Sequence, residues 1–269
     1  MFEQVIVIAG VARSGTSWIG QIVDSSPDVI YRFQPLFSYA FKDSVNEDST
    51  KDEYLHFFKG IYNSSDDFML QIDKREANLY PVFQKRDSPS RLALKENRYH
   101  YLLPKMLQYF DNLKLLGVIR HPCGTLNSWL QNPKEFPPGA DPRKEWRIGN
   151  CKNQGKAENF FGYYKWKEVS HLYLDLKDKF PDRVFLIKYE EFVDNSLALS
   201  KSMFDFVGLE FSEQSDSFLK ASHSIHNDSP YSVFKDKSVK DRWRTELDPY
   251  IVNEVLNDLS GTRLEIFLE

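Results

Sequence analysis

The chain has 269 residues and a formal net charge of −4. Its length suits one α/β domain over residues 1–269, and Lys and Arg show no basic excess, so we expect no nucleic-acid binding. Cys123 and Cys151 are too few for a disulfide framework, and no run of about 18 apolar residues occurs. We therefore expect a reduced, cytoplasmic protein without membrane insertion.

A phosphate-binding loop is the first element that the sequence predicts. The β-branched run Val5–Ile8 is typical of a strand buried on both faces, and apolar residues at helical spacing follow from Thr16 to just before Pro27. The loop Gly10–Ser17 therefore precedes a helix N-terminus, where free backbone N–H groups and the helix dipole favour an anion. A turn that only connects strand and helix is the alternative.

This loop differs from a Walker A loop at one position. Gly10 and Gly15 have the Walker spacing, but Thr16 stands where the lysine that reaches the β and γ phosphates would be. We therefore expect a 5′-phosphate carrying one further anionic group rather than a triphosphate, with Arg13 reaching that anion. A P-loop nucleotide kinase or NTPase stays the alternative enzyme class.

Strands and helices alternate along the rest of the chain. Further strands are predicted at Val29–Phe33, Leu92–Leu94, Leu113–Ile119 and Val184–Lys188, and helices at Glu53–Ile61, Tyr99–Phe110, Cys123–Leu130 and Gln154–Lys179. This alternation predicts a three-layer α/β/α sandwich around a parallel sheet of four or five strands. We expect the helix Glu53–Ile61 to cap the cleft, whereas Asn132–Asn150 is either a mobile substrate loop or a surface excursion.

Two motifs resemble those of sulfotransferases that use 3′-phosphoadenosine 5′-phosphosulfate (PAPS). The run Arg13-Ser14-Gly15-Thr16-Ser17-Trp18 resembles the 5′-phosphosulfate loop of that family, closest to its carbohydrate-type and bacterial branch. The strand that ends in Arg120-His121-Pro122, with Ser128 eight residues after the arginine, resembles the element that holds the cofactor's 3′-phosphate. The resemblance implies transfer of a sulfuryl group from PAPS to a hydroxyl or amine, with 3′-phosphoadenosine 5′-phosphate (PAP) as product.

The resemblance also implies roles for particular residues. Arg13 would neutralise the leaving phosphate, Ser14–Ser17 would supply hydroxyls and amides, and Trp18 would stack on adenine unless it belongs to the core. Tyr189, within Lys188-Tyr189-Glu190-Glu191, would lie near the adenine. The cofactor's 3′-phosphate would be covered by a C-terminal loop with three cations, Lys235, Lys237 and Arg242, although Asp241 replaces the usual glycine and a solvated charge run is the alternative.

The general base is the part of the site that the motifs leave open. Gln34 stands before Pro35 where the carbohydrate-type branch has a glutamate, and Asn97 stands where the cytosolic branch has a histidine, and neither amide can take a proton. Lys95 matches a family lysine that contacts the bridging oxygen. We place Arg13, Lys95, Gln34 and Glu96 at the catalytic centre, with Glu96 as the first choice of base. The further candidate bases are His100 and His226.

The acceptor and the surroundings of the reaction are less clearly indicated. The resemblance favours a carbohydrate, a glycolipid or a small metabolite, and the 15% aromatic content suggests an aromatic-lined acceptor cleft besides the core. No His, Cys or Asp cluster has ligand spacing, so we expect no metal. Because both familiar base positions hold amides, a catalytically inactive PAP-binding protein is a second alternative. The sequence gives no indication of oligomeric state.

Overall fold

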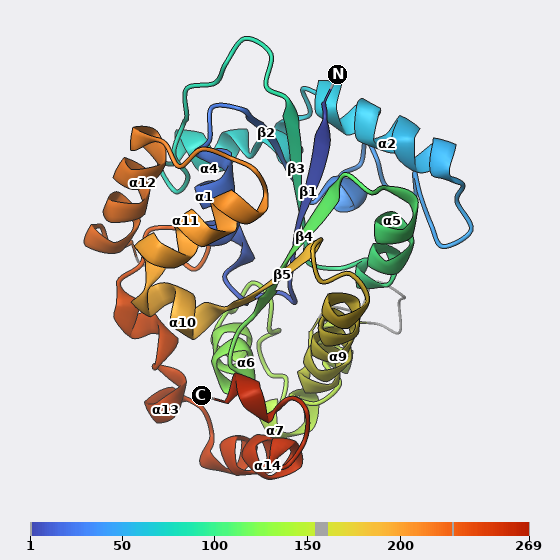
Figure 1. Cartoon of the computed structure of the whole chain (residues 1–269). Helices are drawn as coiled ribbons and strands as arrows, with labels where there is room; N and C mark the ends of the chain where they lie inside the picture. The colour runs from blue at the N-terminus through green and yellow to red at the C-terminus, as the bar shows by residue number, and fades with distance from the viewer. Residues whose placement is uncertain (1, 154–160, 228, 269) are drawn as a thin grey trace.

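The fold is a parallel five-stranded sheet between two layers of helices. The computed structural model describes residues 2–153, 161–227 and 229–268. The strands are β1 (Gln4–Ala9), β2 (Val29–Phe33), β3 (Arg91–Glu96), β4 (Leu113–Ile119) and β5 (Val184–Lys188). They pair in the order β2-β3-β1-β4-β5, and every pair is parallel (Figure 1). The predicted fold class is therefore confirmed.

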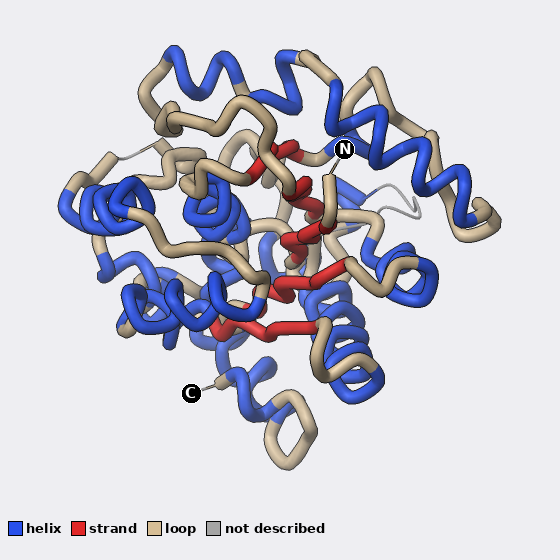
Figure 2. Tube along the Cα trace, turned by 45° about the horizontal axis from the view of Figure 1, so that its top comes forward, coloured by secondary structure: helices blue, strands red, loops and turns tan. Residues whose placement is uncertain are grey.

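The direction of the chain explains why helices cover both faces. From β1 the chain moves outward to β2, and from β3 it crosses back past β1 to β4. Right-handed crossovers in opposite directions place their helices on opposite faces. On one face lie α1 (Thr16–Asp24), α10 (Tyr189–Asp194), α11 (Ser196–Phe206) and α12 (Glu213–Ser224), and on the other lie α2 (Lys51–Asn63), α5 (Leu103–Tyr109) and α9 (Tyr163–Lys179) (Figures 1 and 2).

The remaining helices are shorter or lie around the rim of the sheet. Two short helices follow α2, namely α3 (Asp67–Leu70) and α4 (Ile72–Glu76). The helices that follow β4 or end the chain are α6 (Pro122–Leu130), α7 (Pro142–Glu145), α8 (Asn150–Asn153), α13 (Trp243–Glu246) and α14 (Pro249–Leu259). Single 3₁₀ turns are η1 (Pro35–Phe37), η2 (His100–Leu102), η3 (Lys237–Lys240) and η4 (Glu265–Phe267). Helices α6, α13 and α14 gather beyond the carboxyl ends of the strands (Figure 1).

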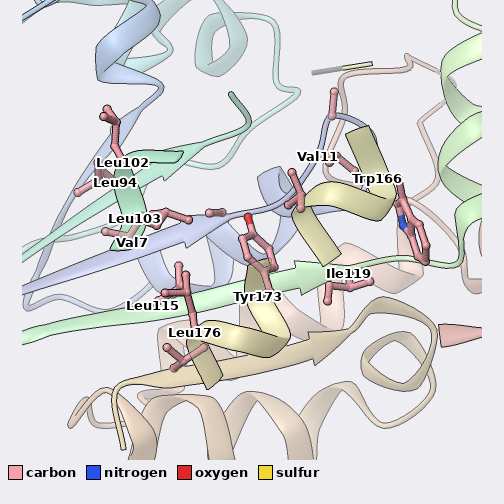
Figure 3. Close-up of a cluster of buried hydrophobic side chains, with 14 of the residues drawn as sticks. Val7, Val11, Leu94, Leu102, Leu103, Leu115, Ile119, Trp166, Tyr173 and Leu176 are labelled. Carbon is pink, nitrogen blue, oxygen red and sulfur yellow. The ribbon is translucent and has the colours of Figure 1, made fainter. Parts of the chain in front are cut away.

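The central strand divides the core into two halves. Val5 and Val7 belong to the half beneath α5 and α9, whereas Ile6 and Ile8 pack beneath α1, because successive side chains of a strand point to opposite faces. All four are buried. Figure 3 shows Tyr173 of α9 pointing toward the strands in the first half. Burial on both faces agrees with the continuous apolar run by which the sequence predicted this strand.

Two expected helices differ from the structure. The long helix α9 begins at Tyr163, after Gly162 at φ 96°, where an added Cβ would lie 2.8 Å from the Arg147 carbonyl oxygen. The expected start at Gln154 lies outside the described residues. Helix α2 does not cap the carboxyl ends of the strands, because its Tyr62 packs against Phe2 in a tilted ring contact and donates to the Pro89 carbonyl near their amino ends. Its buried aromatic residues hold it in the core instead.

None of the helices within the described ranges has both the length and the apolar character needed to cross a bilayer.

Candidate active site

Every strand delivers part of the predicted site at its carboxyl end. The contributions, in the order of the strands, are the loop Gly10–Ser17, Gln34, Lys95 with Glu96, Arg120 and Tyr189. In parallel α/β sheets this edge is where ligands bind, next to the point at which the chain reverses its direction across the sheet. That point lies beside β1 here, and the loop after β1 is the centre of the site.

The loop Gly10–Ser17 has the geometry of an anion cradle. Gly15 is the N-cap residue of α1 at φ 88°, and a Cβ there would lie 2.4 Å from the ring of Tyr189, so only glycine fits. No side chain caps the first turn of α1, and that turn holds no acidic residue. The first amides of α1, at Thr16 and Ser17, therefore remain available to an anion, whereas the Trp18 amide donates to the Gly15 carbonyl at 3.0 Å. The Ser14 hydroxyl is buried and has no hydrogen-bond partner among the described residues.

Arg13 connects the loop to two distant segments. Its Nε donates to Ser128 Oγ at 3.0 Å, and its Nη2 donates to the Pro230 carbonyl at 3.0 Å. Its Nη1 lies 3.9 Å from Glu135 Oε1. Burial lowers the pKa of Arg13, the Glu135 carboxylate opposes that shift, and the charge of Arg120 adds to it.

Arg120 links the loop Gly10–Ser17 to the C-terminal loop. Its Nη1 donates to the Arg13 carbonyl at 3.2 Å, and its Nη2 donates to the Val239 carbonyl at 3.0 Å. Its Nε lies 3.8 Å from Glu190 Oε1 and makes no hydrogen bond within the described part of the chain. The guanidinium also lies 4.9 Å from the centre of the Tyr189 ring. The structure therefore brings Arg120 and Ser128 each into contact with Arg13.

Trp18 lies among core side chains. It is 8% exposed, and its Nε1 donates to Ser222 Oγ at 3.0 Å. The edge-on contacts of its ring are with Tyr189, Phe192 and His223, at centroid distances of 6.2, 5.4 and 5.1 Å. This arrangement is the core alternative that the sequence left open. Tyr189 remains beside the anion loop, because its ring contacts Gly15 and Arg120.

The C-terminal loop meets Arg120 through its backbone rather than through its cations. Lys235 donates to the Asn227 carbonyl, Lys237 donates to the Asp194 carbonyl at 3.4 Å, and Arg242 is exposed. The end of this loop is fixed by Trp243, which stacks on His121 at a centroid distance of 4.3 Å. The structure thus places the three predicted cations around the rim of the site.

Lys95 and two amides form the side of the site next to β2. Lys95 is 2% exposed, its Nζ lies 4.2 Å from the centre of the Phe33 ring, and burial lowers its pKa to about 7. Asn97 accepts a 3.0 Å hydrogen bond from the Thr16 hydroxyl and is thereby fixed against the anion loop. Gln34 is half-buried at φ 42°, and its backbone N–H donates to the Lys95 carbonyl at 2.8 Å.

Glu96 does not lie where we expected the general base. It follows Lys95 in β3 and therefore points to the opposite face of the sheet, where its Oε1 accepts from the Leu36 N–H at 3.1 Å. It lines a small cavity together with Tyr99 and Met106. Burial raises its pKa to about 8, so the carboxyl is mostly protonated at neutral pH.

The two candidate histidines are also engaged elsewhere. His100 is buried with its Nε2 3.0 Å from the Asn97 carbonyl and its Nδ1 3.0 Å from the Tyr173 hydroxyl. Burial lowers its pKa to about 3. His226 pairs with Asp236 at 2.6 Å on the rim. The structure therefore directs neither imidazole toward the anion loop.

Sequence reasoning gave no role to Glu135 or to Tyr231, which stands at the start of the C-terminal loop, and both face Arg13. Glu135 lies in the segment that the sequence left undetermined. The Tyr231 ring centre lies 5.8 Å from Arg13, 5.8 Å from Lys74 and 5.6 Å from Lys134. Because no periodicity or spacing marks these residues, only the fold brings them to the site. Among the residues described, no group of His, Cys, Asp and Glu could hold a metal ion.

The fold and the loop together define a P-loop-like α/β architecture. Its anion loop contains an arginine, Arg13, and lacks the Walker lysine. The model of the sulfotransferase family matches residues 5–213. The chain therefore belongs to the sulfotransferase family.

Solved structures agree with this assignment at the level of the fold. Mouse sulfotransferase SULT7A1 complexed with PAP is 15% identical, with a TM-score of 0.59 over 100% of this chain and 88% of that chain. A sulfotransferase from Alicyclobacillus acidocaldarius is 14% identical, with a TM-score of 0.56 over 100% and 96%. Retinol dehydratase in a complex with retinol and PAP is 14% identical, with a TM-score of 0.56 over 98% and 83%. A comparison with curated protein sequences finds no significant match.

Proposed function

We propose that the protein transfers a sulfuryl group from PAPS to an acceptor hydroxyl or amine and releases PAP. The observation that carries this proposal is the convergence of Arg13, Arg120 and Ser128 on one loop at the N-terminus of α1. Two of the similar structures contain PAP, which supports the same nucleotide here. The missing Walker lysine argues against a nucleotide kinase or NTPase.

The described residues fit a nucleotide with a 5′-phosphosulfate and a 3′-phosphate. The uncapped amides of α1 and the buried, unpartnered Ser14 hydroxyl offer donors to an anion. Arg120 Nε is a further donor that has no hydrogen-bond partner within the described ranges. Buried donors without partners cost free energy, so their presence at one place supports an anionic ligand there.

The mechanism follows from where these donors lie. PAPS, when bound, supplies the sulfuryl group and leaves as PAP. Arg13 and the α1 amides would bind the 5′-phosphate and stabilise the negative charge that develops on it. Lys95, held against Phe33, would donate toward the bridging oxygen. Arg120 would bind the 3′-phosphate through charge-assisted hydrogen bonds, and Ser128 would support it.

For the acceptor we propose a carbohydrate, a glycolipid or a small metabolite. An aromatic group lies beside Gln34, where Phe68 contacts Phe33 at 5.5 Å and Phe37 at 5.9 Å. Phe37 is 42% exposed, and the Arg98 guanidinium lies 3.6 Å from the centre of its ring. This partly exposed aromatic surface next to Lys95 supports an acceptor with a ring or an apolar portion. A single-domain, cytoplasmic enzyme that needs no metal and binds no nucleic acid completes the proposal.

Calorimetry and a transfer assay test this function. We expect PAP to bind more tightly than adenosine 5′-phosphate, and ATP with Mg²⁺ to bind weakly. Labelled PAPS with a panel of sugars, phenols and alcohols should release PAP in an acceptor-dependent manner. Preference for ATP with Mg²⁺ over PAP would favour the nucleotide-kinase alternative. Tight PAP binding without any transfer would favour an inactive PAP-binding protein.

A further inference from the structure

Sulfuryl transfer to a hydroxyl needs a group that accepts the acceptor's proton, and the residues first considered for it are unsuitable. Gln34 and Asn97 are amides. The Glu96 carboxyl faces the opposite side of the sheet from Lys95, and both nitrogens of His100 have partners. A base for the reaction must instead lie within reach of Arg13 and Lys95, where the sulfuryl group would be held.

Glu135 lies beside Arg13 on a hydrogen-bonded turn. The turn follows α6, and the backbone amides of Glu135 and Phe136 both donate to the Asn132 carbonyl, at 2.9 and 2.8 Å. Trp129 packs against Phe136 at 5.4 Å and donates from its Nε1 to the Glu135 carbonyl at 3.4 Å. Asn132 and Trp129 are 2% and 1% exposed. The position of Glu135 is therefore preorganised by buried neighbours.

The Glu135 side chain points back toward the anion loop. Its Oε1 lies 3.9 Å from Arg13 Nη1, its charge acts on Lys95, and the Tyr231 hydroxyl lies close to its carboxylate. Its side chain is 18% exposed. Its second oxygen, Oε2, is shielded from solvent and has no hydrogen-bond partner among the described residues. One oxygen thus faces Arg13, and the other is a buried acceptor that lacks a donor.

We propose that Glu135 is the general base of sulfuryl transfer, an inference that rests on the proposed function. Its carboxylate accepts the acceptor's proton while the acceptor oxygen forms a bond to sulfur. The bond between sulfur and the 5′-phosphate oxygen breaks at the same time, and its electron pair leaves with the phosphate beside Arg13. The proton ends on Glu135, and PAP leaves with the negative charge.

A pair of acceptors separates this role from a structural one. At about pH 8, 4-nitrophenol is already largely ionised and needs no base, whereas benzyl alcohol keeps its proton until transfer. Glu135→Gln should therefore lower transfer to benzyl alcohol by about 10²–10⁴-fold and transfer to 4-nitrophenol by less than about tenfold. Glu145→Gln, a change of the same kind in the same segment, should leave both rates unchanged.

The outcomes distinguish the inference from the function on which it rests. Equal losses with both acceptors would show that Glu135 only orients Arg13, and this would overturn the inference. PAP affinity of Glu135→Gln, measured by calorimetry, should stay within about threefold of wild type and reports that the nucleotide site is intact. Wild-type protein that binds no PAP, or that releases PAP from PAPS with no member of the panel of sugars, phenols and alcohols, would overturn the proposed function itself.

Discussion

Glu96→Gln tests whether the neighbouring residues Lys95 and Glu96 have separate roles. The glutamine can keep the hydrogen bond from the Leu36 N–H but carries no titratable group. Burial raises the pKa of Glu96 from 4.5 to about 8 in the folded protein. Each pKa unit corresponds to about 1.4 kcal/mol, so ionising Glu96 costs the folded state roughly 4–5 kcal/mol in full and about 3 kcal/mol at neutral pH.

The sign of the effect follows from proton binding. Between pH 4.5 and about 8 the folded protein holds the Glu96 proton while the unfolded chain has lost it, so this group lowers stability as pH rises through that window. Glu96→Gln removes this loss. The variant should match wild type below pH 4.5 and should be more stable by about 3 kcal/mol at neutral pH. Its transfer rate should stay within about threefold of wild type.

Urea unfolding of wild type and Glu96→Gln across this pH range measures the difference in stability. A transfer assay at neutral pH measures the difference in rate. Glu210→Gln, a change at an exposed glutamate, serves as the control and should show no such pH dependence. A stability difference that does not change with pH would refute the buried-carboxyl argument. Loss of transfer with PAP binding intact would show that Glu96 is the base after all.

Three further substitutions test other parts of the site. Lys95→Met should lower transfer by about 10²–10³-fold yet stabilise the protein at neutral pH in urea unfolding. Burial lowers the Lys95 pKa from 10.5 to about 7, so the unfolded chain binds this proton more strongly than the folded protein does. The wild type should therefore gain stability as pH rises from 7 to 10.5. Arg120→Ala should weaken PAP binding by roughly 1.5–3 kcal/mol and the binding of adenosine 5′-phosphate much less, as measured by calorimetry. Ser128→Ala should show the same difference in a milder form. Equal losses for both ligands would contradict a role in binding the 3′-phosphate. Gly15→Ala should destabilise the fold by about 1–3 kcal/mol in thermal unfolding, because φ is 88° and the Tyr189 ring occupies the space for a Cβ; unchanged stability would contradict this geometry.

Local patterns in the sequence were sufficient to predict the architecture. The strands and their parallel pairing follow from short apolar runs that alternate with segments of helical periodicity. The anion loop follows from Gly10 and Gly15 between a buried strand and a helix N-terminus. These features depend on residues close together in the chain, so their physical cause can be read directly. The motif of Arg120 and Ser128 could be recognised for the same reason.

Only the tertiary structure decided which side chains meet at the site. Arg13 contacts the carbonyl of Pro230, 217 residues away. It also faces Glu135, which lies in a segment with no periodic pattern. Successive side chains of β3 point to opposite faces of the sheet, so the sequence implies that Lys95 and Glu96 lie on different faces. Which of them faces the anion loop depends on the order of the strands and the hand of the crossovers. Contacts between distant segments arise from the packing of whole elements, and no local spacing in the sequence records them.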